Sequence, residues 1–71
     1  MDVRFTRHAK NRMRWRGITK TEVQSVLSNP DAVERLSQDK KNYFKIISKR
    51  RIRVTAIQEE RELVVITAVV K

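Results

Sequence analysis

The sequence predicts an α+β fold in two layers, with two N-terminal helices packed on a three- to four-stranded antiparallel sheet. Up to Pro30 the chain carries two segments with helix start and stop residues, and beyond Pro30 its apolar residues recur at every second position. The chain has only 71 residues and shows no repeat or linker, so we expect one domain over residues 1–71. Helices followed by a β-meander bury their apolar surfaces most simply as a helix layer on a sheet.

The first helix is expected between Thr6 and Gly17. The Thr6 hydroxyl can cap the free amide groups at the start of the helix, and Gly17 suits the left-handed conformation that ends many helices. Ala9 and Met13 lie four residues apart and mark the buried side. Residues 1–5 can add a short strand before this helix.

The second helix is predicted to begin at Thr19, where "TKTE" is typical of a capping box, because Glu22 follows the capping threonine by three residues. Ile18 and Val23 occupy the two positions of a hydrophobic staple, which fixes the direction in which the chain enters the helix. Pro30 stops the helix. The buried stripe is predicted to consist of Val23, Val26 and Leu27.

Three strands are predicted over residues 43–49, 51–58 and 63–70, and a fourth can form over residues 32–37. The last segment, "LVVITAVV", is rich in β-branched residues and too short for a membrane-spanning helix, which indicates a well-buried strand. Alternate side chains of a strand point to opposite faces of the sheet. The face beneath the helices is expected to hold Phe44, Ile46, Ile52, Val54, Ala56, Val64, Ile66, Ala68 and Val70. The opposite, open face is expected to hold Tyr43, Lys45, Ile47, Lys49, Arg51, Arg53, Thr55, Leu63, Val65, Thr67 and Val69.

The chain carries a net charge of +9, from 17 Lys and Arg against 8 Asp and Glu. A surface that is charged only for solubility usually mixes both signs, whereas this excess is one-sided, so a polyanionic partner is expected. Neither predicted helix has the bulky apolar face needed for binding at a membrane surface, and no segment is long enough to span a membrane. Nucleic acid, and RNA in particular, is therefore the expected partner.

Cysteine and histidine counts limit the chemistry further. The chain has no cysteine, which excludes disulfides and thiolate metal sites and is typical of a reducing compartment. A single histidine cannot build a structural zinc site, and no cluster of acidic residues replaces it, so neither a metal nor a cofactor is expected. The N-terminus lacks the apolar stretch of a signal peptide, and we expect a soluble cytoplasmic protein.

The stretch "FTRHAKNRMRWRGIT" contains the candidate catalytic residues. His8, Arg12 and Arg16 recur every four residues and therefore line one side of the first helix. Nearby guanidinium groups disfavour a charged imidazole, so a neutral His8 can act as a base toward a ribose hydroxyl while the arginines bind phosphate. Arg53 is expected to stabilise phosphate charge together with them.

Two points stay open in this interpretation. RNA cleavage requires a second group that carries a proton. Tyr43, a lysine or an acid such as Glu34 are the candidates, and their spacing in the sequence does not decide among them. His8 can also be a packing residue, with Arg12 or Arg16 bonded to helix-end carbonyls or to an acid. The position of the helix decides between these readings, because His8 can share a site with the open-face arginines only if the helix lies at the edge of the sheet.

The open face is the candidate RNA-binding surface, because it is basic along two strands and presents an aromatic side chain, and such sheets bind single-stranded RNA. The predicted nucleic-acid-binding residues are Arg16, Tyr43, Lys45, Lys49 and Arg51. The same pattern also fits a solvated face whose aliphatic strip contacts a second subunit, so a homodimer is a compatible alternative.

The opening stretch also resembles a known family. A His-Ala-x-x-Arg-Met run, followed by Arg-Gly-Ile and Val-Leu-x-x-Pro, is typical of the prokaryotic domain-of-unknown-function family four-two-five-eight. The later "RIRVTAI" and "LVVITAV" segments are similar to the paired closing strands of that family. Trp15 stands where the family commonly has an acidic or another polar residue. The matching positions are His8, Ala9, Arg12, Met13, Arg16, Gly17, Ile18, Val26, Leu27 and Pro30.

This resemblance implies a layout like that of RelE-type toxins, in which a short strand and two helices precede an antiparallel sheet. Many proteins of that fold are ribonucleases that act without a metal and are paired with an antitoxin protein. The resemblance therefore implies an RNA-binding, metal-independent endoribonuclease of toxin type. Two alternatives stay open: a non-catalytic nucleic-acid-binding module, and a protein-interaction subunit whose "LVVITAVV" strand pairs with a partner at an exposed edge.

Overall fold

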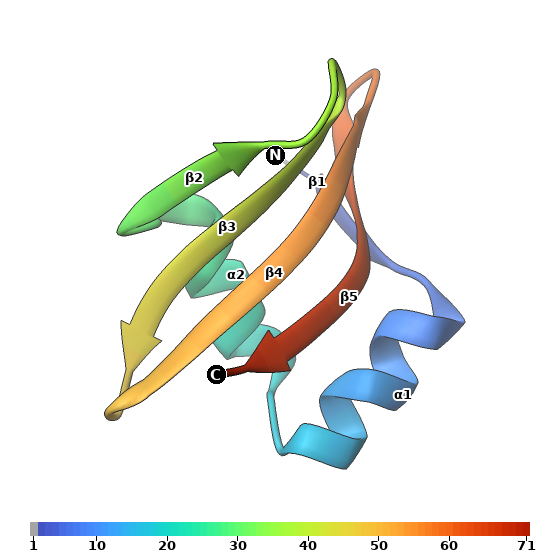
Figure 1. The fold of residues 1–71 in the computed structure, drawn as a ribbon. Helices are drawn as coiled ribbons and strands as arrows, with labels where there is room; N and C mark the ends of the chain where they lie inside the picture. The colour runs from blue at the N-terminus through green and yellow to red at the C-terminus, as the bar shows by residue number, and fades with distance from the viewer. Residues whose placement is uncertain (1) are drawn as a thin grey trace.

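The structure is a computed structural model that describes residues 2–71, in which two helices pack on one face of a five-stranded sheet (Figure 1). The predicted α+β class and both predicted helices are confirmed. The short strand expected over residues 1–5 begins at Asp2, and Met1 lies outside the described residues. The elements are β1 (Asp2–Phe5), α1 (Arg7–Arg16), α2 (Lys20–Ser28), β2 (Ala32–Arg35), β3 (Lys40–Ile47), β4 (Arg50–Glu59) and β5 (Glu62–Val70).

The sheet differs from the predicted one in the number and direction of its strands. The strands lie in the order β1-β5-β4-β3-β2, so β5 lies between β1 and β4. β1 runs parallel to β5, with Asp2 opposite Glu62 and Phe5 opposite Val65, whereas the other neighbouring strands are antiparallel. The prediction of three or four antiparallel strands was therefore wrong. The cause is the pairing of β1 with β5, which joins the two ends of the domain and leaves no local pattern in the sequence.

Both helices begin and end as predicted. Thr6 Oγ1 accepts a hydrogen bond from the Ala9 amide (3.1 Å), and Gly17 ends α1 with a φ of +64°. At α2 the Thr19 hydroxyl accepts a hydrogen bond from the Glu22 amide, and the Glu22 carboxylate accepts one from the Thr19 amide, which completes the predicted capping box. The helix ends therefore depend on residues that lie next to one another in the sequence.

The core lies between the two helices and the face of the sheet that they cover (Figure 1). The predicted core residues of α1, of α2 and of most of β4 are confirmed, whereas the predicted faces are exchanged on β3 and on the first half of β5. The buried cluster consists of Ala9, Met13, Ile18, Val23, Val26, Ile52, Val54, Val65 and Ala68.

On β3 a tight turn exchanges the two predicted faces. Ser48 and Lys49 connect β3 to β4 as a two-residue turn, and both have left-handed backbone conformations with φ of +51° and +67°. The resulting register places Tyr43 opposite the buried Val54, and residues opposite each other share a face. Ile46, which was predicted for the core, is instead 62% exposed. The open face therefore holds Phe44 and Ile46, and the covered face holds Tyr43, Lys45 and Ile47.

On β5 a β-bulge exchanges the faces of the first half of the strand. Thr67 lies opposite Thr55, but Val65 lies opposite the next residue, Ala56, so Ile66 is an extra residue in the ladder. Residues 67–70 keep their predicted faces. Leu63 and Val65 turn to the covered face and Val64 to the open face, which removes two residues from the aliphatic strip predicted to contact a second subunit.

An ion pair between Glu22 and Arg50 joins α2 to β4. Arg50 donates to a Glu22 carboxylate oxygen through Nη2 and to the Gly17 carbonyl oxygen through Nη1 (3.2 Å). The pKa of the Glu22 carboxyl is lowered, first by the hydrogen bond from the Thr19 amide and further by Arg50. Because this pKa is lower in the folded state, the contribution of the carboxylate to stability is complete above its ordinary pKa of 4.5 and is lost as the pH falls through the folded value.

Glu22→Gln is expected to lower the free energy of unfolding by about 1 kcal/mol at pH 7, because the amide can still cap the helix but no longer pairs with a charge. At pH 3 the loss is expected to be smaller, since this pH lies below the ordinary pKa of 4.5 that the carboxyl has in the unfolded chain, and the carboxylate no longer makes its full contribution to stability. Urea titrations at the two pH values measure both losses. Glu60→Gln, on the exposed β4–β5 turn, is the matched control and should change stability by less than about 0.5 kcal/mol. Equal losses for Glu22→Gln at both pH values would contradict the prediction.

Candidate functional site

α1 lies along the edge of the sheet rather than across its centre. β1 pairs with β5 only from Glu62 to Val65, and beyond Val65 the neighbour of β5 on that side is α1. The Thr6 amide donates to the Val65 carbonyl oxygen (3.1 Å), and Arg16 Nη1 donates to the Ala68 carbonyl oxygen (3.4 Å). Figure 1 shows α1 beside β5, with α2 behind the sheet. β5 is therefore not the free edge strand that the protein-interaction alternative required.

His8, Arg12 and Arg16 form the predicted row on one side of α1, which we call the α1 row. All three residues are exposed. Arg12 Nε donates a hydrogen bond to His8 Nε2 at 3.3 Å. The α1 row therefore combines one imidazole, whose Nε2 is the hydrogen-bond acceptor, with two guanidinium groups.

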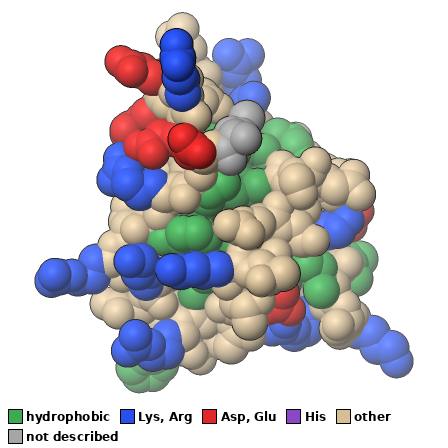
Figure 2. Space-filling model, turned by 180° about the vertical axis from the view of Figure 1, so that it is seen from behind, with side chains coloured by type: hydrophobic (Ala, Val, Ile, Leu, Met, Phe, Trp, Pro, Cys, Tyr) green, Lys and Arg blue, Asp and Glu red, His purple; other side chains and the backbone are tan. Residues whose placement is uncertain are grey.

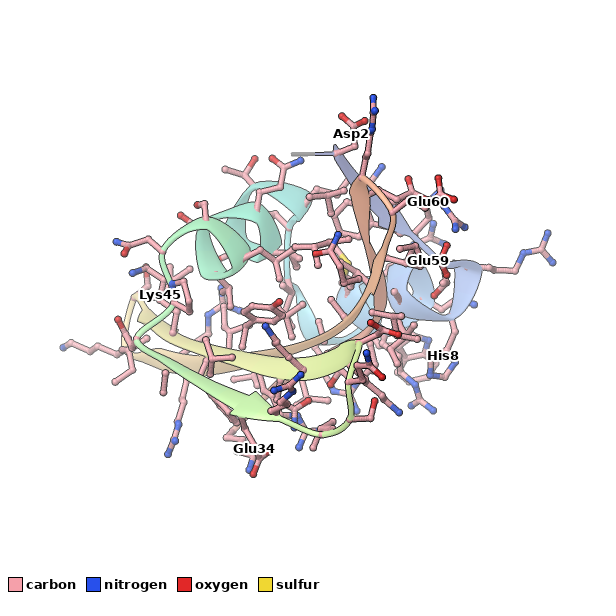
Figure 3. The ribbon with its side chains drawn as sticks, turned by 90° about the horizontal axis from the view of Figure 1, so that it is seen from above. Asp2, His8, Glu34, Lys45, Glu59 and Glu60 are labelled. Atoms are coloured by element: carbon pink, nitrogen blue, oxygen red, sulfur yellow. The ribbon has the colours of Figure 1, made fainter. Side chains whose placement is uncertain are left out.

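The α1 row separates two hollows in the surface. The sheet-side hollow has a volume of about 620 Å³ and is lined by the row together with Thr6, Ile66 and Thr67. The outer hollow has a volume of about 450 Å³ and is lined by the row together with Asn11 and Trp15. Figure 3 shows that the histidine of the row projects from α1 at the lateral edge of the sheet. The row thus faces β5 on one side and the outer surface of α1 on the other.

A chain of polar side chains leads from the sheet-side hollow across the open face. Thr67 lies opposite Thr55 on the neighbouring strand. Thr55 Oγ1 donates to Asn42 Oδ1 (2.5 Å), and Asn42 Nδ2 donates to Glu34 Oε1 (2.9 Å). Thr55 and Asn42 are buried, and their hydrogen bonds hold these polar groups in fixed positions. A row of polar groups therefore runs along the open-face side of the sheet from Thr67, beside α1, to Glu34 on β2, and its middle members are buried.

Two arginines of β4 lie on the open face, as predicted. The Arg51 guanidinium lies over the Phe44 ring, 5.4 Å from the ring centroid, which is a cation–π geometry. Arg53 lies opposite Phe44 and Val69, and its Nε is buried without a hydrogen-bond partner in the described part of the chain. A buried donor without a partner costs about 1–3 kcal/mol, which a bound anion can offset.

The three other predicted binding residues lie away from this surface. Tyr43 is half-buried on the covered face, where burial raises the pKa of its phenol. Lys45 is also on that face, and its Nζ donates to the Asn29 carbonyl oxygen (2.9 Å) and lies 3.7 Å from Asp31 Oδ1. Figure 3 shows Lys45 on the helix side of the sheet and Glu34 on the opposite side. Lys49 belongs to the β3–β4 turn. The prediction that these three residues lie on the open face was wrong. The turn at Ser48 and Lys49 sets a register that places Tyr43 and Lys45 opposite Val54 and Ile52, on the covered face.

The surface includes residues that the sequence did not single out. Phe44 was expected in the core, and Asn42 lay outside the predicted strands. A two-residue turn at Ser48 and Lys49 would have placed Phe44 on the open face, but neither turn residue is the Gly or Asn that normally marks such a turn. No local pattern places Thr67 beside α1, since only the packing of β5 brings the two together.

Charge is unevenly distributed over the molecule. α1 carries five basic side chains and no acidic one. Acidic residues gather instead at the β4–β5 turn, where Asp2, Glu59, Glu60 and Glu62 line one hollow together with a single basic residue, Arg61. Figure 2 shows acidic side chains gathered at one end of the helix side of the molecule, with basic side chains beside them and elsewhere on that side. An anion that approaches this protein is therefore favoured at α1 over the β4–β5 turn.

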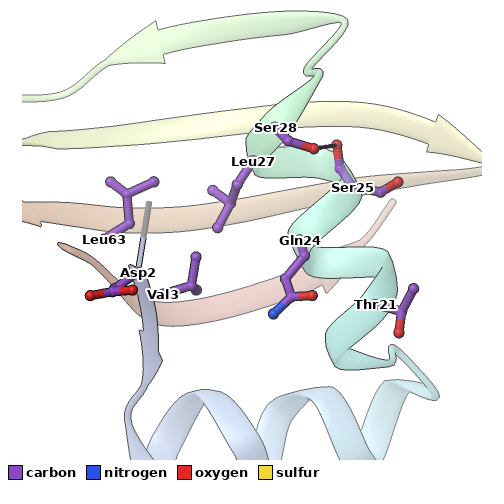
Figure 4. Close-up of a pocket in the computed structure, with 8 residues that line it drawn as sticks. All are labelled: Asp2, Val3, Thr21, Gln24, Ser25, Leu27, Ser28 and Leu63. Atoms are coloured by element: carbon purple, nitrogen blue, oxygen red, sulfur yellow. Dashed lines mark hydrogen bonds between the residues drawn. The ribbon is translucent and has the colours of Figure 1, made fainter.

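A further hollow, of about 820 Å³, lies on the helix side between α2 and β1 (Figure 4). Val3, Leu27 and Leu63 form its apolar part, and none of its lining residues is basic. Neither of the two helices is long and apolar enough to cross a membrane. Among residues 2–71, no group of three or more His, Cys, Asp or Glu side chains is placed to hold a metal ion.

Fold and surface together define a class of protein, namely a small basic α+β domain whose first helix borders the open face of a mixed sheet. Comparison with protein families then gives the particular family. The family described as "Domain of unknown function (DUF4258)" matches residues 5–70 of the sequence. The chain belongs to this family. The matched range contains both helices and β2 to β5. No curated protein and no solved structure matches the chain.

Proposed function

We propose that the protein is a basic RNA-binding domain that cleaves RNA without a metal ion, as a toxin-type endoribonuclease. The observation that carries the proposal is the position of the α1 row, because it brings one imidazole and two guanidinium groups to the border of the open face, beside Thr67. The net charge of +9 supports a polyanionic partner.

In the proposed reaction His8 acts as the general base. Its Nε2 accepts the proton of a ribose 2′-hydroxyl, the 2′-oxygen attacks the adjacent phosphorus, and the bond from phosphorus to the 5′-oxygen breaks. The leaving oxygen takes a proton from water, so the products carry a 2′,3′-cyclic phosphate and a 5′-hydroxyl. Arg12 leaves His8 Nε2 for the phosphate, where it and Arg16 stabilise the charge on the non-bridging oxygens.

The open face supplies the RNA-binding surface in this proposal. Arg53 has an unpartnered buried Nε that can donate to a phosphate oxygen. Arg51 and Phe44 together offer a cation and an aromatic ring to the strand. Thr67 and Thr55 connect these residues to the α1 row, so one RNA strand can contact both.

The toxin-type part of the proposal rests on analogy between folds, which by itself does not define chemistry. The order of elements, a short strand and two helices before a β-meander, is similar to the layout of RelE-type toxins. Many proteins with that layout are paired with an antitoxin protein, and we propose such a protein as a second partner. Its contact with the α1 row would block RNA from the same surface.

The proposal is tested by incubating the protein with single-stranded RNA in EDTA and identifying the products by mass spectrometry. We expect 2′,3′-cyclic phosphate and 5′-hydroxyl ends. An oligonucleotide of the same sequence with 2′-deoxyribose throughout is the matched control, and it should stay uncleaved because it lacks the attacking hydroxyl. If the RNA is bound by the protein but stays intact, the proposed cleavage is overturned. If the RNA is neither bound nor cleaved, the whole proposal is overturned.

One observation favours a non-catalytic RNA-binding module as the second candidate. Among the residues that line the two hollows, His8 carries the one imidazole and none carries a carboxyl or phenol group, while Tyr43 lies on the covered face. The hollows therefore supply one proton carrier rather than two. This module would bind RNA through the basic open face and leave it intact.

Arg51→Ala is expected to weaken RNA binding to a similar degree for all sequences, because Arg51 contacts the strand through charge and not through base edges. The slope of the logarithm of the association constant against the logarithm of the salt concentration should become shallower by about 0.7. This is the value for one phosphate contact to a single strand. Fluorescence anisotropy of labelled RNA over a range of salt concentrations measures this slope. Arg61→Ala, which removes the same charge at the exposed β4–β5 turn, should leave the slope unchanged. Equal slopes for wild type and Arg51→Ala would exclude Arg51 from the interface.

A further inference from the structure

Trp15 is exposed to a degree that packing does not account for. Its side chain is 87% exposed, well above Ile46 at 62%, Val33 at 49% and Leu36 at 48%. Tryptophan buries more apolar surface than any other residue when it packs, and in folded proteins it is highly buried on average. A tryptophan side chain that packs so little against its own protein is available for contact with a partner.

The neighbours of Trp15 belong to the α1 row. Trp15 lines the outer hollow together with His8, Arg12, Arg16 and Asn11. The same three residues of the row line the sheet-side hollow, which continues to Thr67 and the open face. A strand that lies along the open face and crosses the α1 row therefore reaches Trp15 next.

The chemistry around Trp15 favours RNA over a protein partner. All charged residues of α1 are basic, and the helix has no acidic residue that could pair with a cation of a partner. An aromatic ring beside guanidinium groups is the usual platform for single-stranded nucleic acid, because a base stacks on the ring while cations bind the backbone. The ring of Trp15 offers that stacking surface, and Arg12 and Arg16 offer the cations.

We infer that Trp15 is a base-stacking residue that makes the domain selective for unpaired RNA next to the α1 row. The inference rests on the proposed RNA-binding function and adds a substrate class to it. In a duplex both faces of each base are already stacked, so only an unpaired base can lie on Trp15. Trp15 and His8 are two helical turns apart, roughly 10 Å along the axis. Stacked nucleotides at about 3.4 Å each cover that distance in about three steps, so the stacked base lies close to the phosphate at His8.

The experiment uses Trp15 as its own reporter, since it is the only tryptophan in the chain. Intrinsic fluorescence is recorded during titration with a single-stranded RNA oligonucleotide and, separately, with the same strand annealed to its complement. Each RNA also carries a terminal label, so that anisotropy reports binding independently of Trp15. We expect single-stranded RNA to quench the fluorescence in parallel with binding, and duplex RNA to leave it unchanged.

Two substitutions complete the test. Trp15→Ala is expected to weaken single-strand binding roughly 5- to 150-fold, the range for loss of one base–aromatic stack. Trp15→Phe keeps an aromatic face and should retain most of the affinity. Val33→Ala is the matched control, because it removes another exposed apolar side chain from β2, opposite Tyr43 on the covered face, and it should retain wild-type affinity. Thermal unfolding verifies that all variants fold, as expected for residues that pack little.

The outcomes separate this inference from the function on which it rests. RNA binding with unchanged Trp15 fluorescence, together with wild-type affinity of Trp15→Ala, would overturn the inference, leave the RNA-binding proposal standing and point to a protein contact for Trp15. Equal quenching by single-stranded and duplex RNA would overturn the selectivity for unpaired bases. An anisotropy that does not respond to either RNA would overturn both proposals.

Discussion

His8→Ala is expected to abolish RNA cleavage while leaving folding and RNA affinity nearly unchanged. His8 is exposed and has one side-chain hydrogen bond, from Arg12 at 3.3 Å, so its removal should cost less than about 0.5 kcal/mol of stability. A positioned general base contributes roughly 10²- to 10⁴-fold to the rate, and cleavage should fall by that factor. RNA affinity should persist because Arg12, Arg16 and the open-face arginines remain.

The measurement compares cleavage rates in EDTA with RNA affinities for the same proteins. His8→Gln is a useful second variant, because an amide can accept the hydrogen bond from Arg12 but cannot take a proton near neutrality. Arg14→Ala removes a charge from the same helix at a position that lines neither hollow, and it should cleave like wild type. If His8→Ala cleaves at the wild-type rate, His8 is not the base and the α1 row has a binding role alone.

Ile52→Ala is expected to lower the free energy of unfolding by a large part of its total. Ile52 is fully buried in the core cluster between helices and sheet. Loss of a buried isoleucine to alanine costs about 2–5 kcal/mol, because the removed methyl groups lose their burial and leave a cavity. A domain of 71 residues has roughly 4–11 kcal/mol of stability at about 0.05–0.15 kcal/mol per residue, so this loss is a large part of the total.

Ile46→Ala is the matched control, since it makes the same chemical change on the neighbouring strand. Ile46 is 62% exposed on the open face, and its truncation should cost less than about 1 kcal/mol. Urea denaturation followed by circular dichroism gives both free energies. The pair also tests the register of β3, because Ile46 was expected in the core from alternation alone. Equal losses for Ile46→Ala and Ile52→Ala would mean that β3 presents the opposite face.

The sequence was sufficient for the helices because their boundaries depend on adjacent residues. Thr6, Gly17 and the Thr19–Glu22 capping box each act within one turn of the chain. The same is true of the α1 row, whose three members recur every four residues and therefore share one side of any helix. Its composition could be predicted, and so could the two arginines of β4 on the open face.

The sheet could not be predicted to the same extent. Both sets of alternating residues on β3 contain large apolar side chains, so alternation did not decide which face is buried. The deciding feature was the turn at Ser48 and Lys49, which carries none of the usual turn residues. The bulge at Ile66 and the pairing of β1 with β5 depend on contacts between segments that are distant in the chain. The position of α1 at the sheet edge follows from those same contacts.

The place of β5 between β1 and β4 has a consequence for how the protein is made. Ribosomes synthesise chains from the N-terminus, so α1 leaves the ribosome long before β5 does. Arg16 and Val70 are 54 residues apart, which corresponds to roughly 3–11 s at about 5–20 residues per second. Until β5 emerges, β1 lacks its partner and α1 lacks the strand edge beside it. The nascent chain can therefore form its helices early, but the sheet-side hollow comes into existence only once the last strand of the domain is in place.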